Sequence, residues 1–430
     1  MSIAPTGAER EALDLAWLTG PEAVAALAAA VEPDGAELLE ATVHDVHHRP
    51  GAGVTVGYDV RLRGPRGEEV TEYLLLTTAD LGSRGDPHAH AGIVELRTAD
   101  RLLHVWRHPS DPLLPGLAQA CSIEEATRRV GFEPEEGEAT LELIGYRPLR
   151  RAVLSLTNPM RRVYLKVVRP QQLEVLLARN RYAEPAGAPE VLDVWPESVL
   201  VFAQAHGEPL PELLARDGAA NVDPREFVRC LDALDPAGLD LPLRPVWTDR
   251  TPHYANAARN VLPDDAARID ALAEGVVKGL ATIPSGPLVV THGDFHAANI
   301  LMNGPRIGSL LDVDTLGPGQ RVDDLACLLG HLTVLPSLAP GVYPAVPDTV
   351  RRWLKVFDEY VEPAALRLRA AGVVLSLLAS MPARSEQDVG TTASLTAADG
   401  SGAGAEAVRL DARARLAAAE NLVAEGLALR

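Results

Sequence analysis

The chain has little cysteine and few aromatic residues. Of its 430 residues, only three are cysteine and 4% are aromatic. Cys121, Cys230 and Cys327 form neither a metal-binding spacing nor a disulfide framework, which favours a reducing cytoplasm. No signal peptide is recognised, and the apolar run at residues 372–381 is too short to span a bilayer. These absences predict a soluble cytoplasmic protein with a core built mainly from alanine, leucine and valine.

Positive charge is also scarce. The chain holds 40 Lys+Arg against 59 Asp+Glu, a formal net charge of -19. Nucleic acids and anionic membranes attract positively charged surfaces, so we expect neither as a partner. The acidity is compatible with a cationic ligand, although an acidic surface more often serves only solubility. The oligomeric state is left open.

Lysine is the rarest charged residue. Only Lys166, Lys278 and Lys355 are lysines, and arginine supplies every other basic side chain counted. In so biased a chain, a lysine in a chemically suggestive position carries extra weight.

The N-terminal part is predicted to be a small β-rich module. Apolar residues at helical spacing predict one or two short helices over residues 12–30. Alternating residues at 54–64, 70–78, 92–98 and 102–108 then predict the strands of an antiparallel sheet. Ser122 and Glu125 form a capping-box pattern, which predicts the start of a helix that leads out of this module.

A second β-rich region follows at residues 138–205. Residues 141–157 and 161–170 predict two strands separated by a turn at 157–160. A helix is expected from about Pro170, and residues 191–195 and 198–205 supply two more strands. Beyond residue 208 the chain is mainly helical. We therefore expect an α+β fold with domains at residues 1–135, 136–207 and 208–430.

The strongest chemical pattern is HGDFHAANIL at residues 292–301. Asp294 stands five residues before Asn299, and Asp312 follows thirteen residues after Asn299 in the apolar run SLLDVD. Phosphoryl transfer needs one carboxylate to orient or deprotonate the acceptor hydroxyl, and a second carboxylate with an amide oxygen to hold magnesium. The alternative for Asp294 and Asn299 is an ordinary capped turn, because both residue types favour turns.

HGDFHAANIL, the following LLDVD and Asp324-Leu325-Ala326 together resemble the kinase-like small-molecule phosphotransferases. These are the aminoglycoside phosphotransferases, choline kinases and maltokinases, and the resemblance covers roughly residues 138–430. It implies a bilobal protein-kinase-like fold, with residues 136–207 as the N-lobe, residues 208–430 as a helical C-lobe, and residues 1–135 as an added N-terminal cap.

The resemblance also implies ATP and Mg2+ as cofactors and a role for each motif residue. Asp294 matches the catalytic aspartate. Asn299 and Asp312 match the magnesium-binding asparagine and aspartate. His292 and Asp324 are expected to support the catalytic loop.

Lys166 interrupts the apolar strand YLKVV, where burial without a partner would be costly. It resembles the family lysine that binds the nucleotide phosphates, and a surface lysine is the alternative. The resemblance implies a glutamate partner on the next helix, with Glu174 ranked before Glu184. It also implies that the backbone near Gln204 and Ala205 binds adenine.

Two departures from the family pattern are visible. The segment GYRPLRR at residues 145–151 has one glycine where protein kinases have a glycine-rich loop. Its arginines could contact phosphate, although exposed strand arginines are the simpler interpretation. The segment GQRVDD at residues 319–324 lacks the Gly-Asp-Pro that relatives often have before the last aspartate. Gln320 in this segment is either a substrate contact or an inert loop residue. His296 either binds a sugar hydroxyl or shapes the loop.

The N-terminal module narrows the choice of acceptor. Maltokinases carry such a cap, and the motifs also resemble the maltokinase-like bacterial kinases that phosphorylate glucosamine. Asp323, Glu420 and Glu425 are candidates for pairing with a substrate ammonium, and Glu420 is the one we select, although most such carboxylates are surface charge. The sequence thus predicts an ATP-dependent kinase that makes a sugar 6-phosphate, glucosamine first. Maltose and an aminoglycoside are the alternative acceptors, and a nucleotide-binding pseudokinase is the non-enzymatic alternative.

Overall fold

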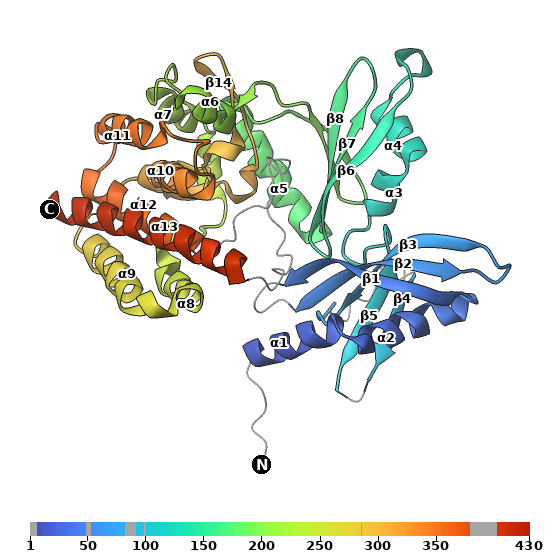
Figure 1. Cartoon of the computed structure of the whole chain (residues 1–430). Helices are drawn as coiled ribbons and strands as arrows, with labels where there is room; N and C mark the ends of the chain where they lie inside the picture. The colour runs from blue at the N-terminus through green and yellow to red at the C-terminus, as the bar shows by residue number, and fades with distance from the viewer. Residues whose placement is uncertain (1–6, 49–52, 82–91, 99, 285, 379–401) are drawn as a thin grey trace. The chain divides into compact units, whose positions relative to one another are not determined.

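The computed structural model describes residues 7–48, 53–81, 92–98, 100–284, 286–378 and 402–430 (Figure 1). They form two compact units. The first comprises the described residues up to 173 together with 192–203, and the second comprises 174–191 and the described residues from 204 onward. The three-domain division expected from the sequence stays a prediction.

The first unit begins with two helices against an antiparallel sheet. Strand order is β1-β2-β3-β5-β4, with α1 and α2 on one face of the sheet (Figure 1). Leu18, Leu27 and Val31 of the helices are buried with Val56, Val60 and other apolar strand residues. The elements are α1 (Gly7–Leu18), α2 (Pro21–Val31), β1 (Glu37–His48), β2 (Val54–Arg63), β3 (Glu69–Thr77), β4 (Ile93–Arg97) and β5 (Leu102–Arg107). The helices and the sheet predicted for this module are confirmed.

A second five-stranded antiparallel sheet completes this unit, with strand order β6-β7-β8-β10-β9. Helix α4 starts as predicted, because the Ser122 side chain accepts the backbone N–H of Glu125 at 3.3 Å. The elements are α3 (Leu117–Cys121), α4 (Ile123–Val130), β6 (Thr140–Arg147), β7 (Arg151–Thr157), β8 (Arg162–Val168), β9 (Val191–Trp195) and β10 (Val199–Ala203).

One strand prediction in this sheet is wrong. Residues 141–157 are a hairpin of β6 and β7 and not one continuous strand. Pro148 has no N–H to donate to a sheet, and Leu149 takes a left-handed conformation with φ of 62°. The chain therefore reverses at residues 148–150.

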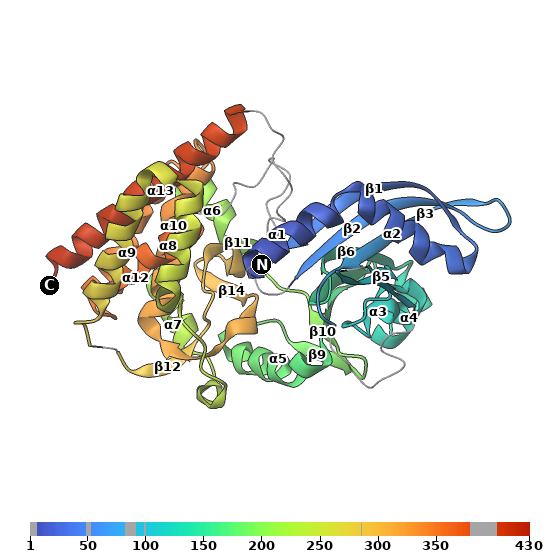
Figure 2. The same ribbon diagram turned by 90° about the horizontal axis from the view of Figure 1, so that it is seen from below.

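The second unit is mainly helical, as predicted. Helices α10 and α13 pack against α12, and α8 and α9 lie beside α12 (Figures 1 and 2). Five short strands lie between the helices, and the predicted catalytic and metal-binding loops adjoin them. The helices are α5 (Pro170–Ala183), α6 (Leu210–Asp217), α7 (Arg225–Asp232), α8 (Thr251–Val261), α9 (Ala266–Leu280), α10 (Arg321–Leu338), α11 (Val346–Phe357), α12 (Pro363–Leu377) and α13 (Gly402–Ala428). The strands are β12 (Leu288–Thr291), β13 (Ile300–Asn303), β14 (Arg306–Leu310) and β15 (Gly317–Gln320), with β11 (Glu208–Pro209) beside β13.

The α+β fold class is confirmed, with a β-rich N-terminal part and a mainly helical C-terminal part. The core is built largely from alanine, leucine and valine, as expected from the scarcity of aromatic residues. Within the described ranges, no single helix is long and apolar enough to cross a membrane. The bent pair Glu9–Leu18 and Pro21–Asp34 passes that test on length and composition alone.

Candidate active site

The loop at residues 292–299 joins β12 to β13. Gly293 has a φ of 82°, a left-handed conformation that favours glycine. A Cβ atom at this position would lie 2.8 Å from the backbone oxygen of Thr315. The loop therefore packs closely against the segment that follows Asp312, and this contact requires a glycine between His292 and Asp294.

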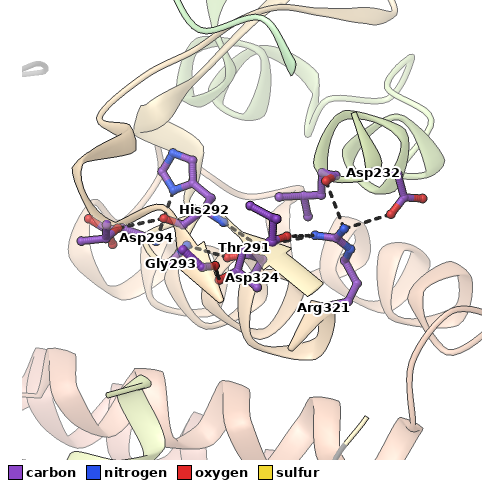
Figure 3. A network of polar contacts seen from close by, with 11 residues as sticks. Asp232, Thr291, His292, Gly293, Asp294, Arg321 and Asp324 are labelled. Carbon is purple, nitrogen blue, oxygen red and sulfur yellow. Dashed lines mark hydrogen bonds and ion pairs between the residues drawn. The ribbon is translucent and has the colours of Figure 1, made fainter. Parts of the chain in front are cut away.

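Asp324, in the first turn of α10, holds the start of this loop. Its two carboxylate oxygens accept the backbone N–H groups of His292 at 3.0 Å and Gly293 at 2.8 Å (Figure 3). Asp324 is fully buried, with the Arg321 guanidinium 3.7 Å away. Burial raises the pKa of Asp324 to about 7, partly offset by the hydrogen bonds and by Arg321. The support predicted from the sequence thus has a physical basis in two hydrogen bonds.

His292 links the loop to the Asp312 segment. Its Nε2 lies 2.9 Å from the carbonyl oxygen of Leu311, and its Nδ1 accepts the backbone N–H of Asp294 at 3.2 Å. Both contacts require a neutral ring with the proton on Nε2. Burial lowers the pKa of His292 to about 4, which keeps the ring in this form near neutral pH.

Asn299 and Asp312 lie at the same end of the β13–β14 hairpin, because Asn299 precedes β13 and Asp312 follows β14. Ile300 pairs with Leu310, and the Leu311 N–H donates to the Asn299 carbonyl at 2.8 Å. Asn299 Nδ2 donates to the Asp294 carbonyl at 3.0 Å and to His296 Nε2 at 3.2 Å, so its Oδ1 is the side-chain atom left to face a cation.

Asp312 is exposed and has a φ of 51°, a conformation that non-glycine residues adopt rarely. An amide oxygen and a carboxylate at one end of the hairpin fit Mg2+, which prefers oxygen ligands. Proteins commonly supply one or two of these ligands, and substrate phosphates supply others. The donor set required for the metal is therefore present.

Lys166 lies on the central strand of the second sheet, opposite Val153 of β7 and Leu200 of β10. Its neighbours Leu165 and Val167 are buried in the core beneath α3 and α4, so Lys166 points to the other face of the sheet. Glu174 and Glu184 are both exposed on the second unit. Their pairing with Lys166 stays a prediction.

Gln204 and Ala205 connect β10 to β11. The next residue is anchored on β14, because the His206 N–H donates to Ser309 Oγ at 2.8 Å and Ser309 Oγ donates back to the His206 carbonyl at 3.0 Å. The predicted adenine-binding backbone is therefore tethered on its C-terminal side.

The structure separates Gln320 from Asp294. In the β12–β15 pair, Gln320 lies opposite Leu288, whereas the catalytic loop begins beyond Thr291 at the other end of β12. Three strand residues span about 10 Å. Gln320 Oε1 instead accepts a hydrogen bond from the Arg369 guanidinium at 2.8 Å, and Gln320 lines a cavity of about 450 Å³. This placement counts against Gln320 as a contact of a substrate bound at Asp294.

The acidic candidates for an ammonium partner already contact arginines. Asp323 pairs with Arg369, and Glu420 binds Arg268 through two hydrogen bonds of 2.7 and 3.0 Å. Glu425 lies 3.6 Å from Arg367. A substrate ammonium would have to compete with these guanidinium groups.

His296 lies beside the catalytic aspartate candidate. Its Nε2 is 3.8 Å from Asp294 Oδ2, and its ring stacks on that of His331 with centroids 4.5 Å apart. Burial lowers the pKa of His296. Of the two roles expected for His296, the hydrogen bond with Asn299 supports loop shaping.

Two groups of residues near the site were not predicted. Arg179 of α5 is buried and donates to the backbone oxygens of Asp314 at 2.6 Å and Leu316 at 2.9 Å. Cys327 and His331 of α10 lie beside Asp294. Arg179 had no local signal in the sequence, but the four-residue spacing of Cys327 and His331 on a predicted helix could have indicated a shared face.

Comparison with known proteins identifies one family. Residues 150–343 match the phosphotransferase enzyme family, and this segment is less than half of the chain. No curated protein matches.

Several solved structures are similar to the chain, each at low identity. A thermostable mutant of the aminoglycoside phosphotransferase APH(4)-Ia has 16% identity and a TM-score of 0.47, with 71% of this chain and 99% of that chain covered. A choline/ethanolamine kinase family protein from Mesorhizobium loti has 19% identity and a TM-score of 0.43, with 71% and 98% covered. Choline kinase from Cryptosporidium parvum Iowa II has 13% identity and a TM-score of 0.44, with 73% and 94% covered.

The family match coincides with the predicted chemistry. Lys166, Asp294, Asn299, Asp312 and Asp324 all fall within residues 150–343, whereas Glu420 falls outside. The segment that carries the catalytic and metal-binding candidates thus matches the phosphotransferase enzyme family, which supports the superfamily expected from the motifs.

Proposed function

We propose that this protein is an ATP-dependent phosphotransferase that phosphorylates a sugar hydroxyl. One arrangement carries the proposal. Asp294, Asn299 and Asp312 come from two chain segments that the Leu311–Asn299 and His292–Leu311 contacts join at one end of the β13–β14 hairpin. A capped turn alone would not require the second segment, so this arrangement argues against that alternative.

In this proposal each residue has a separate task. Asp294 orients the acceptor hydroxyl and takes its proton as the hydroxyl oxygen bonds to the γ-phosphorus and the bond from that phosphorus to ADP breaks. Asn299 Oδ1 and the Asp312 carboxylate would hold Mg2+, which when bound neutralises charge on the nucleotide phosphates. Lys166, with Glu174 as its expected partner, binds phosphate, and the backbone at Gln204 and Ala205 binds adenine.

The loop is preorganised before any substrate binds. Asp324 and His292 hold the backbone on both sides of Gly293, and Thr315 Oγ1 donates to the His292 carbonyl at 2.8 Å. A base that is already positioned loses little entropy during the reaction, which lowers the barrier for a well-placed hydroxyl. His292 and Asp324 therefore act as positioning residues.

For the acceptor, we propose glucosamine, giving glucosamine 6-phosphate, with maltose and an aminoglycoside as alternatives. The added N-terminal module supports a maltokinase-type sugar kinase. The arginine partners of Asp323, Glu420 and Glu425 weaken the case for these carboxylates as ammonium ligands. The amino-sugar assignment therefore depends on the resemblance and not on a carboxylate visible in the fold.

Replacement of the base tests the reaction. Asp294→Asn should lower kcat by about 10²- to 10⁴-fold while Mg2+–ATP still binds, because the amide cannot accept the proton. Asp348→Asn on α11, which removes a surface partner of Arg351, is the matched control and should leave turnover unchanged. Unchanged turnover in Asp294→Asn would contradict the mechanism.

A screen of acceptors tests the specificity. Glucosamine, glucose, maltose and kanamycin are each supplied with ATP and Mg2+, and the phosphorylated product is identified by mass spectrometry. Phosphorylation of maltose alone would contradict the amino-sugar assignment. Tight ATP binding without transfer to any acceptor would favour the pseudokinase alternative.

A further inference from the structure

Helix α10 presents two potential metal ligands to the catalytic loop. Cys327 and His331 are one helical turn apart, so their side chains share a face. Cys327 is buried, and the backbone of Phe295 hydrogen-bonds its thiol. The His331 ring stacks on His296. The thiol and the imidazole therefore both adjoin the loop that carries Asp294.

The ligand atoms of these residues converge. One carboxylate oxygen of Asp294, the Cys327 sulfur and one His331 ring nitrogen all lie within 4.8 Å of one another. In a tetrahedral zinc site with bonds of 2.0–2.3 Å, neighbouring ligand atoms are about 3.5 Å apart. Side-chain adjustments of roughly 1 Å would close the group around an ion.

A second observation concerns His331 itself. Its Nε2 is fully buried and has no hydrogen-bond partner among the described residues. An unsatisfied buried nitrogen destabilises the folded protein, and such a group calls for an explanation such as an ion bound to it. Metal coordination would satisfy the imidazole.

We propose that Asp294, Cys327 and His331 form a Zn2+ site with one open coordination position. Thiolate and imidazole are ligands that favour zinc over magnesium, so the site would discriminate against the ion used in phosphate transfer. Binding releases the Cys327 proton to solvent and leaves a metal-bound thiolate. The Asp294 side chain is 30% exposed, which provides access to the otherwise buried group.

Occupation of this site has a consequence that rests on the proposed function. A carboxylate that coordinates Zn2+ cannot accept the proton of the acceptor hydroxyl. Zinc bound here therefore inhibits phosphate transfer by withdrawing Asp294, without displacing ATP from the residues expected to bind it.

Direct binding tests the site independently of turnover. Co2+ added to the full-length protein should give a thiolate-to-cobalt absorption band with a stoichiometry of one, and Zn2+ should displace it. Cys327→Ser should abolish the band, and His331→Gln should weaken Co2+ binding by at least about 10-fold. Circular dichroism and melting temperature establish that each variant is folded.

The other two cysteines provide matched controls. Cys230 is buried and donates to the Ala186 carbonyl, whereas Cys121 lies 3.8 Å from His108 Nε2. Cys230→Ser and Cys121→Ser should both retain the band. Absence of a band in the wild-type protein would overturn the proposal. So would a band that survives Cys327→Ser or disappears in Cys121→Ser, because the metal would then lie elsewhere.

Inhibition is measured separately, with ATP and Mg2+ held in excess. Zn2+ should inhibit the wild-type enzyme, a chelator should restore turnover, and Cys327→Ser should require at least about 10-fold more Zn2+ for the same inhibition. Equal inhibition of both proteins would overturn the regulatory role. A protein that binds Co2+ through Cys327 but phosphorylates no acceptor would contradict the proposed function and leave the metal site supported.

Discussion

At the scale of single residues, the candidate site depends on buried polar groups that are hydrogen-bonded. Asp324 is fully buried, yet both of its oxygens accept backbone N–H groups of the catalytic loop. Burial of a charge is costly unless such bonds compensate it. The pKa of about 7 for Asp324 indicates that the compensation is incomplete.

We predict that Asp324→Asn changes the pH dependence of stability. In the unfolded chain this carboxyl has its ordinary pKa of 3.8, whereas in the folded protein it stays protonated until about pH 7. The unfolded state therefore binds fewer protons over this window, and the contribution of Asp324 to stability falls as pH rises. The full change is about 4 kcal/mol, because each pKa unit corresponds to about 1.4 kcal/mol.

The melting temperatures of the wild type and Asp324→Asn between pH 4 and pH 8 provide the measurement. The wild type should lose stability relative to the variant up to about pH 7, and the difference should then level off. Asp348→Asn, on the surface of α11, should show no such trend. A difference that grows in favour of the wild type as pH rises would show that the carboxylate is ionised throughout.

At the scale of elements, the turn of the β6–β7 hairpin is fixed by side-chain hydrogen bonds. Asp111 accepts the Leu149 N–H at 2.7 Å and the Tyr146 hydroxyl at 2.7 Å. Arg169 donates to the Leu149 carbonyl. Leu149 is buried beside Trp106 and Leu113, so the first sheet and the hairpin share a small core. Hydrogen bonds from residues outside the hairpin therefore stabilise this turn, and its conformation does not depend on glycine.

Removal of the anchor should loosen the turn. We predict that Asp111→Ala destabilises the protein by about 2–4 kcal/mol, because the buried donors of Leu149 and Tyr146 lose their acceptor. If the turn contacts nucleotide, KM for ATP should rise more than kcat falls. Thermal unfolding and steady-state kinetics measure the two effects, with Asp100→Ala, an exposed partner of Arg101, as the control. Unchanged stability would show that Asp111 is not needed to hold the turn.

At the scale of the whole molecule, the residues proposed to bind the nucleotide are far apart in the sequence. Lys166 lies on β8, whereas Asn299 and Asp312 flank the β13–β14 hairpin. A ligand that binds only the folded protein stabilises it by about 2.7 kcal/mol at a concentration 100 times its Kd. Mg2+–ATP should therefore raise the melting temperature, and EDTA should remove most of the increase.

Lysine scarcity provides a sharp control for this prediction. Lys166→Met should abolish most of the ATP-dependent increase in melting temperature, because the cation expected to contact phosphate is lost. Lys278→Met removes an exposed lysine of α9 that pairs with Glu274, and should retain the increase. An equal increase in both variants would contradict the role proposed for Lys166.

Local patterns in the sequence are sufficient to predict most helices and strands and to recognise the main motif at residues 292–301. Strand alternation, the Ser122 cap and the helix start at Pro170 depend on neighbours within a few residues, and all three are confirmed. The chain reversal at Leu149 has no such local pattern in the sequence. That left-handed turn is stabilised by Asp111, which lies 38 residues away.

Such local patterns do not predict contacts between residues that are far apart in the sequence. The spacing of Asp294, Asn299 and Asp312 indicated phosphate chemistry, but packing alone brings Cys327 and His331 to Asp294 and places Gln320 at the opposite end of β12. Spacing encodes backbone preferences and shared faces, because these act over one or two turns of chain. The neighbours of a side chain across the core depend instead on how whole elements pack. Only the tertiary structure determines that packing.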